Sequence, residues 1–118
     1  MRPREDTILL TDMLDYARRA VIALEGQSRE TLETDAVLAG ALERFVEVIG
    51  EAAGRLSETT REMAAEIPWQ EIIAMRNRLV HGYFAVDLNI LWTVVNDDLP
   101  DLIDALERLV TSRTDSSA

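Results

Sequence analysis

The segment DAVLAGALERFVEVIGEAAGRLS, residues 35–57, decides the fold. Its apolar residues recur at alternating spacings of four and three, which places them on one face of an α-helix. Asp35 suits the N-cap, because its carboxylate can accept a hydrogen bond from a backbone N–H of the first turn. We therefore predict a helix over 35–57 whose buried stripe consists of Leu38, Leu42, Phe45, Ile49, Ala52 and Leu56.

Similar apolar stripes stand on both sides of this segment. One predicts a helix over 4–25, followed by Gly26 at a position that suits a C-terminal cap. Another runs from Leu88 to Leu109, and Pro100 removes a backbone donor within it, so we expect a kink or a restart there. Residues 111–118 have no apolar spacing, and we expect a frayed tail.

Two shorter helices are expected between these stripes. Thr59 and Glu62 fit a capping box, which predicts a brief helix over 60–66. Pro68 suits the first turn of a further helix that continues from Trp69 to about His81. The sequence therefore predicts an all-α, up-and-down bundle of four to five helices.

Length and composition indicate one domain, residues 1–118, with no disulfide and no thiolate metal site. There is no cysteine, and a reducing cytoplasm is the expected compartment. No apolar run approaches the roughly 20 residues of a membrane span. We expect a cytoplasmic protein without membrane contact.

The charge is strongly negative but uneven along the chain. Twelve arginines face 22 acidic residues, giving a net charge of −10, which opposes nucleic-acid binding at long range. Residues 51–84 are almost neutral, with four arginines against five glutamates. These arginines form a candidate phosphate-binding patch made of Arg55, Arg61, Arg76 and Arg78.

The candidate functional residues lie in the run Arg76-Asn77-Arg78-Leu79-Val80-His81-Gly82-Tyr83, which contains the only histidine. Histidine titrates at about pH 6.5 and can transfer protons at cellular pH. An arginine beside it can stabilise the negative charge of a reacting phosphate. Together they suit metal-independent RNA cleavage in which the neighbouring 2′-hydroxyl is the nucleophile.

Arg76 is predicted in the middle of the apolar stripe of its helix, where a charge needs a partner. Two explanations remain open: an ion pair with Glu51, or a cleft between subunits where the cation meets phosphate. Cleavage needs both a base and an acid, yet each chain has one histidine. A symmetric dimer would supply both through two copies of His81.

Plainer interpretations stand beside this one. An arginine and a histidine near a helix end often have only a structural role. Glu43, Glu47 and Glu51 recur every four residues, but with Arg44 interleaved they fit a solvated face better than a metal site. There is no glycine-rich phosphate loop and no zinc signature, so neither a metal nor a cofactor is expected.

The run resembles the Arg-x4-His-x-Tyr motif of HepT-like toxins, a branch of the HEPN superfamily. The resemblance covers about residues 5–110. It extends to the segments Ile67-Pro68-Trp69-x-x-Ile72-Ile73-x-Met75, Asp87-Leu88, Ile49-Gly50-Glu51-Ala52-Ala53 and Asp98-Leu99-Pro100.

This resemblance implies a HEPN-like homodimer with a composite RNA-binding cleft, in which Arg76 and His81 form the catalytic pair of an endoribonuclease and Asn77 assists. It further implies a nucleotidyltransferase antitoxin that neutralises the toxin and adds AMP to Tyr83. Beside it we expect Arg78 and Arg55 to contact RNA phosphates. Two alternatives remain: a non-catalytic HEPN module that binds a nucleotidyltransferase or a nucleotide, and a purely structural bundle.

Overall fold

The computed structural model describes residues 3–81 and 85–117. Within these ranges a few side chains lie outside the description: those of Pro3, Arg76, Val80, His81, Ala85 and residues 114–117. None of the described helices combines the length and the hydropathy that crossing a bilayer requires.

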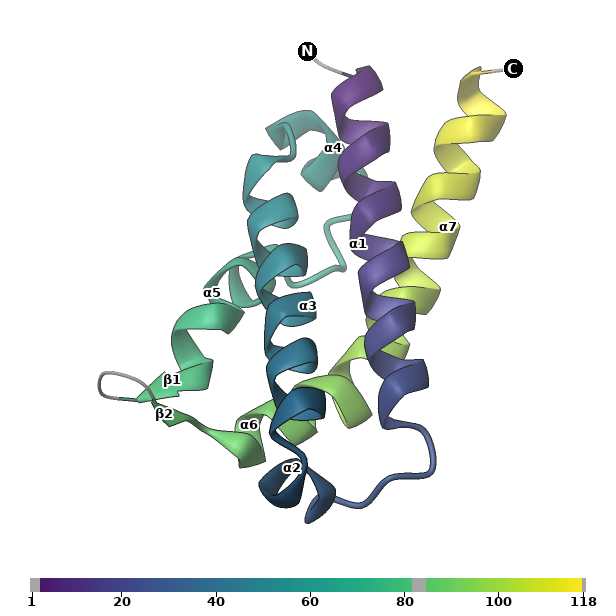
Figure 1. Ribbon diagram of the computed structural model, residues 1–118. Coiled ribbons are helices and arrows are strands. Elements are labelled where there is room, and N and C mark those ends of the chain that lie inside the picture. The colour runs from purple at the N-terminus through teal and green to yellow at the C-terminus, as the bar shows by residue number, and fades with distance from the viewer. Residues whose placement is uncertain (1–2, 82–84, 118) are drawn as a thin grey trace.

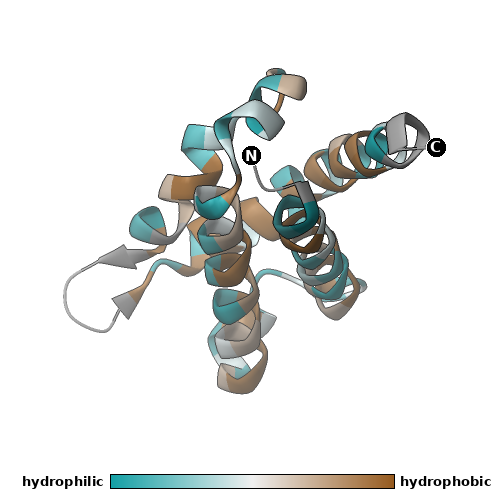
Figure 2. Ribbon diagram, turned by 90° about the horizontal axis from the view of Figure 1, so that it is seen from above, coloured by the Kyte–Doolittle hydropathy of each residue, from teal (hydrophilic) through white to brown (hydrophobic). Residues whose placement is uncertain are grey.

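Four long helices form an up-and-down bundle, which confirms the predicted fold class. They are α1 (Pro3–Leu24), α3 (Ala36–Arg55), α5 (Trp69–Leu79) and α7 (Leu99–Ser117), and successive members run in opposite directions (Figure 1). α1 packs against α3 and α7, and α3 packs against α5. Hydrophobic and hydrophilic residues alternate along these helices (Figure 2), as expected when one face of each is buried.

Short elements connect the long helices. They are α2 (Thr31–Thr34), α4 (Glu58–Met63), α6 (Leu88–Thr93), the π-helical turn η1 (Val94–Asp98), and the antiparallel strands β1 (Val80–His81) and β2 (Ala85–Val86). The hairpin of β1 and β2 projects from the bundle beyond the end of α5 (Figure 1). The sequence predicted a helix near α4, but neither α2 nor the strands.

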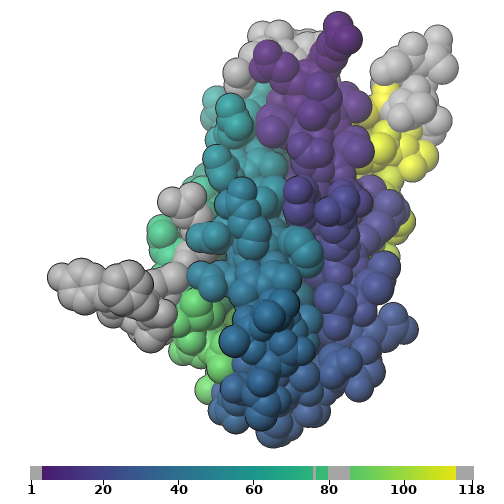
Figure 3. All heavy atoms as spheres, in the orientation of Figure 1, coloured from purple at the N-terminus to yellow at the C-terminus, as the bar shows by residue number. Residues whose placement is uncertain are grey.

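The core lies where the long helices meet. On α3, Leu42, Val46 and Ile49 are completely buried, whereas Phe45 of the predicted stripe is half-buried and stacks at a tilt on Tyr16 with ring centroids 5.7 Å apart. α1 and α3 form a continuous surface in the space-filling view (Figure 3). The buried core around these α3 residues includes Leu10, Met13, Ala17, Leu91, Val94, Leu99 and Leu106.

The predicted end of α1 and the predicted start of α3 are confirmed to within one residue, whereas α3 ends at Arg55, two residues earlier than predicted. α1 ends at Leu24, and Gly26 has a φ of 77°, the left-handed conformation that glycine adopts without a steric penalty. α3 begins after Asp35, whose Oδ1 accepts a hydrogen bond from the backbone N–H of Leu38 at 3.0 Å.

Two other predicted boundaries were wrong. The N-cap of α4 is Ser57 and not Thr59, because the Ser57 hydroxyl accepts the backbone N–H of Thr60. α5 ends at Leu79 and not at His81, because the carbonyl oxygen of Leu79 accepts the N–H of Asp87 and the chain enters a strand. A β-branched residue follows Leu79, which favours the strand.

The kink or restart expected at Pro100 is present as a local irregularity in a continuous helical stretch. Pro100 is the second residue of α7, and the π-helical turn η1 precedes it, which is a usual way for a helix to accommodate a local irregularity. The frayed tail predicted from Thr111 was wrong, since α7 continues to Ser117. Arg113 anchors it by donating hydrogen bonds to the hydroxyls of Thr60 and Thr7, at 3.1 and 3.0 Å.

A buried carboxylate joins the ends of α1, α4 and α7. Asp6 is 1% exposed and accepts hydrogen bonds from the backbone and hydroxyl of Ser57 and, at 2.6 Å, from the hydroxyl of Thr60. Burial raises the pKa of Asp6, but these hydrogen bonds and the charge of Arg113 outweigh it, so the pKa is below its ordinary value of 3.8. Asp6 therefore remains ionised and holds the three helices together.

Candidate active site

The candidate site begins on α5, which carries Arg76 and Asn77. Ile72 and Leu79, which lie one turn before and one turn after Arg76 on the helix, are both buried, as the predicted apolar stripe requires. The Arg76 side chain is outside the described part of the structure. Asn77 is exposed. Arg76 therefore occupies a helix position between two buried residues, and Asn77, the next residue, is exposed to solvent.

A close backbone contact fixes α5 on α3. A Cβ added at Gly50 would lie 3.0 Å from the carbonyl oxygen of Ile72 and 3.6 Å from that of Ile73. A Cβ added at Gly54, one turn later, would make only an ordinary contact with the Ile73 side chain. The absence of a side chain at Gly50 thus sets how near α5 approaches α3, and with it the position of Arg76.

The hairpin fixes the backbone of His81 relative to α5. His81 pairs with Ala85, and Val80 pairs with Val86. Asp87 then ends the hairpin: its N–H bonds to Leu79, and its Oδ1 caps α6 by accepting the N–H groups of Asn89 and Ile90. The strand pair and the bonds of Asp87 therefore join the end of α5 to the start of α6 and hold the backbone of Val80 and His81.

The predicted catalytic group is only partly inside the described residues. The side chain of His81 and all of Tyr83 lie outside the described residues. The backbone places Arg76 and His81 on consecutive elements, α5 and β1. Their roles, and that of Asn77, remain predictions from the sequence.

Glu51, the predicted ion-pair partner of Arg76, is exposed and follows Gly50 on α3. Because α3 and α5 are antiparallel (Figure 1) and Gly50 is level with Ile72, Arg76 lies one turn further toward the start of α3. That level is nearer to Glu47, which is half-buried. The pairing itself involves the Arg76 side chain and so lies outside the described residues.

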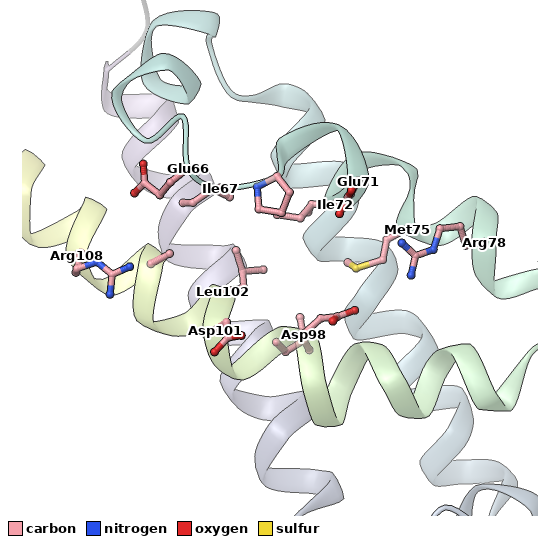
Figure 4. Close-up of a pocket in the computed structure, with 13 residues that line it drawn as sticks. Glu66, Ile67, Glu71, Ile72, Met75, Arg78, Asp98, Asp101, Leu102 and Arg108 are labelled. Carbon is pink, nitrogen blue, oxygen red and sulfur yellow. The ribbon is translucent and has the colours of Figure 1, made fainter.

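The two predicted phosphate contacts, Arg55 and Arg78, are both exposed but stand at different levels of the bundle. Arg55 is in the last turn of α3 beside Gly54, at the level of Ile73. Arg78 lies more than a turn further along α5 and lines a cavity between α5 and α7 together with Asp98 (Figure 4).

Among the residues that the structure describes, no group of three or more histidines, cysteines or acidic residues is arranged to hold a metal ion. Two members of the glutamate row on α3 do interact. Burial, and then the neighbouring charge of Glu47, raise the pKa of the Glu43 carboxyl. These carboxylates repel each other.

Sequence reasoning missed two features near the motif. One is the hairpin, for which the only signal is Val80 before Gly82 and the pair Ala85-Val86 after it. The other is an acidic group beside Arg78, formed by Glu71 from α5 and Asp98 from η1. Nothing in the spacing of two carboxylates so far apart in the sequence indicates that they meet.

Comparison with known proteins gives a consistent family. The model of the family described as "Ribonuclease HepT-like" matches residues 13–109. The match therefore includes α3, the Gly50 contact, the whole motif and most of α7.

Individual relatives agree with this match. The chain is 41% identical to "Probable ribonuclease HepT" of Thermococcus cleftensis over 58% of this chain and 63% of that protein. It is 39% identical to a protein of Caldanaerobacter subterraneus named "Putative RNase", over 79% of this chain and 83% of the relative. A protein of Methanocaldococcus jannaschii with the same description is 29% identical over 91% of this chain and 98% of its own length.

No solved structure matches the chain significantly. The family assignment therefore depends on the family model and on the ribonuclease relatives, and it agrees with the helical bundle in which Arg76 lies on α5 and His81 on β1. The chain belongs to the HepT-like ribonuclease family.

Proposed function

We propose that this protein is the endoribonuclease toxin of a toxin–antitoxin pair, and that it cleaves RNA without a metal ion. The observation that carries the proposal is the complete Arg76-Asn77-x3-His81-x-Tyr83 motif in a chain of the HepT-like ribonuclease family. The fold supports it, because the motif begins on a helix held by the Gly50 contact and continues into a strand pair. A site on rigid elements is suited to catalysis.

The proposed reaction is an intramolecular transesterification. The 2′-hydroxyl of a ribose attacks the adjacent phosphorus, and a base removes the proton of that hydroxyl. The bond to the 5′-oxygen of the next nucleotide breaks, and an acid protonates that oxygen. The products are a 2′,3′-cyclic phosphate and a 5′-hydroxyl. Arg76 stabilises the charge on the phosphoryl oxygens, and Asn77 donates a hydrogen bond to the same group.

The proposed chemistry assigns both proton transfers to histidine, and each chain has one. We therefore propose a homodimer in which two copies of His81 face one cleft, one acting as base and the other as acid. A second copy of Arg76 also increases the positive potential in the cleft. This offsets part of the repulsion that a net charge of −10 exerts on RNA.

The excess of acidic over basic residues favours another function, because it opposes RNA binding. That function is a non-catalytic module that binds a nucleotidyltransferase or a nucleotide. The two functions differ in the need for His81. Purified protein and its His81→Ala and Arg76→Ala variants should be incubated with RNA in EDTA. Arg44→Ala, which removes an exposed arginine that is not part of the motif, is the matched control.

We expect cleavage by the unmodified protein and by Arg44→Ala, with cyclic phosphate ends on the products. Removal of His81 should lower the rate by about 10²–10⁴, the usual contribution of positioned proton transfer. Equal cleavage by His81→Ala would contradict the proposed chemistry. Absence of cleavage by every form, with normal folding, would favour the non-catalytic module.

Neutralisation is proposed to occur by addition of AMP to Tyr83. A phosphate-linked group two residues from His81 would add bulk and negative charge where RNA phosphate must enter. Intact mass after co-expression with a nucleotidyltransferase encoded beside this gene should show one or more added AMP groups. Tyr83→Phe should lack them, while Tyr16→Phe, a control in α1, should retain them. Unchanged modification of Tyr83→Phe would place the acceptor elsewhere.

A further inference from the structure

The bundle is open along one seam. Close packing joins α1 to α3, α1 to α7 and α3 to α5, but within the described residues α5 and α7 stand apart across a cavity of about 380 Å³. The loop before α5 closes one end of it, and η1 lies at the other (Figure 4). We refer to this space as the α5–α7 cavity. Its size is in the range of sites that hold a small ligand or a few side chains.

The floor of the α5–α7 cavity is apolar. Ile72 and Met75 of α5 contribute from one side, and Leu99, Leu102 and Ala105 of α7 from the other. All five are at most 9% exposed, so they are part of the core, yet they also line an opening to solvent. Covering this apolar surface with an apolar group removes it from water and so lowers the free energy of the complex.

The rim of the α5–α7 cavity is predominantly acidic. Four carboxylates surround the floor, those of Glu66, Glu71, Asp98 and Asp101, against two guanidinium groups, those of Arg78 and Arg108 (Figure 4). Partial burial raises the pKa of Asp98; Arg78 lowers it, while Asp97, Glu71 and Asp101 raise it, and the net pKa is above its ordinary value. The carboxylates thus repel one another and would be stabilised by an additional cation.

The acidic, hollowed surface continues beyond Pro68. A second, more open hollow shares Ile67, Pro68 and Glu71 with the α5–α7 cavity and adds Glu58 and Glu62 against Arg61. An elongated occupant can therefore extend from one hollow to the other across Pro68. A compact small molecule would use only one of them.

We propose that the α5–α7 cavity is a docking site for a segment of a partner protein that inserts an apolar side chain between flanking lysines or arginines. The apolar side chain covers the floor, and the cations meet the rim carboxylates. The site uses neither His81 nor Arg76, so the inference goes beyond the proposed RNA cleavage and is independent of it. Bound against α5, the partner would contact the helix that carries the motif.

Charge argues against the other occupants. RNA would bring phosphates to a rim in which carboxylates outnumber arginines. A second copy of this chain has a net charge of −10, so its surface would mostly bring further acidic groups to the rim. A basic segment of another protein satisfies both the apolar floor and the rim.

The test uses two fluorescein-labelled synthetic peptides with the same central leucines, one flanked by arginines and one by glutamates. Binding to the purified protein is followed by anisotropy, and amide shifts in its NMR spectrum locate the site. We expect the basic peptide to bind at least tenfold more tightly, with shifts concentrated in α5, η1 and α7. Equal affinities, or shifts centred on another face, would overturn the proposal.

Two sets of variants separate a built site from general attraction to an acidic protein. Asp98→Asn with Asp101→Asn should weaken the basic peptide by about tenfold. The control, Asp12→Asn with Asp104→Asn, removes two exposed carboxylates that do not line the cavity and should change the affinity less than twofold. Equal weakening by both pairs would show long-range attraction only and would contradict the site.

Filling the cavity gives an independent result. Ala105→Met places a larger side chain on the floor and should weaken the basic peptide at least tenfold without lowering the melting temperature. Unchanged affinity in a folded Ala105→Met protein overturns the proposal. So does loss of self-association in this variant by sedimentation, because a second copy would then be the occupant.

Discussion

Gly50 on α3 lies so close to the backbone of Ile72 on α5 that an added Cβ would be 3.0 Å from the Ile72 carbonyl oxygen. The neighbouring atom belongs to helix backbone and not to the end of a flexible side chain, so it cannot move without moving α5. Arg76 stands one turn after Ile72 on that helix. Helix packing at Gly50 and the position of the candidate catalytic arginine are therefore linked.

Gly50→Ala should destabilise the protein and displace the motif. The overlap is expected to cost about 1–3 kcal/mol, against the roughly 1 kcal/mol that alanine gains over glycine in a helix. Ribonuclease activity should fall further than the folded fraction accounts for, because α5 shifts. Thermal melting and the cleavage rate below the melting transition measure the two effects.

The same helix offers matched controls. A Cβ at Gly40 meets nothing within 4 Å, and one at Gly54 makes only ordinary contacts with Ile73. Gly40→Ala should raise the free energy of unfolding by about 0.5–1 kcal/mol through helix propensity alone. If Gly50→Ala behaves like Gly40→Ala, the Gly50 contact does not limit the approach of the helices.

Asp6→Asn should remove part of the acid sensitivity of the fold. The pKa of Asp6 is lowered in the folded protein, so its contribution to stability is complete above the unfolded value of 3.8 and is lost as the pH falls through the lower folded value. At about pH 7 the variant should be less stable by about 1–3 kcal/mol, because buried hydroxyl donors lose a charged acceptor.

Melting temperatures between about pH 7 and pH 2 test this prediction. The difference between the unmodified protein and Asp6→Asn should shrink below pH 3.8. Asp12→Asn, on the exposed face of α1, should leave the curve nearly unchanged. A constant difference at all pH values would show that Asp6 contributes by packing and not by its charge.

Arg76 and Glu51 should contribute to stability independently. Glu51 is exposed, and an ion pair there is screened by solvent. In a double-mutant cycle of Arg76→Gln and Glu51→Gln, we expect the changes in unfolding free energy to add to within about 0.5 kcal/mol. The same cycle with Glu47→Gln tests the half-buried carboxylate nearer to the level of Arg76. Coupling above about 1 kcal/mol in either cycle would favour a structural ion pair over a free cleft arginine.

The long helices are predictable because their apolar spacing, Asp35 and Gly26 all agree on the same boundaries. The short elements and the exact ends of α5 and α7 are not, because each depends on one or two tertiary contacts. The end of α5 depends on the bond from Asp87 to Leu79, and the extension of α7 on Arg113 reaching Thr60 and Thr7. The Arg113 contacts join residues distant in sequence, and the Asp87 bond closes a hairpin, so neither leaves a pattern of spacing along a helix.

The candidate site likewise has parts that the sequence predicts and parts that it does not. The motif itself is visible in the sequence, because it gathers the only histidine with an arginine and a tyrosine. The Gly50 contact and the acidic rim at Asp98 are not, because a glycine in a helix and separated carboxylates have many ordinary explanations. Both depend on how far apart the packed helices lie.

In the proposed dimer, two copies of His81 act in one cleft, one as base and the other as acid. A covalently linked dimer in which a single copy carries His81→Ala tests it directly, because the start of α1 and the end of α7 lie at one end of the bundle (Figure 1), where a linker can join two copies. Its cleavage rate should be compared with that of the linked dimer with both histidines. We predict a loss of about 10²–10⁴, since one of the two proton transfers is then uncatalysed. A linked dimer that keeps half of the activity would show that each chain cleaves RNA alone and would contradict the account.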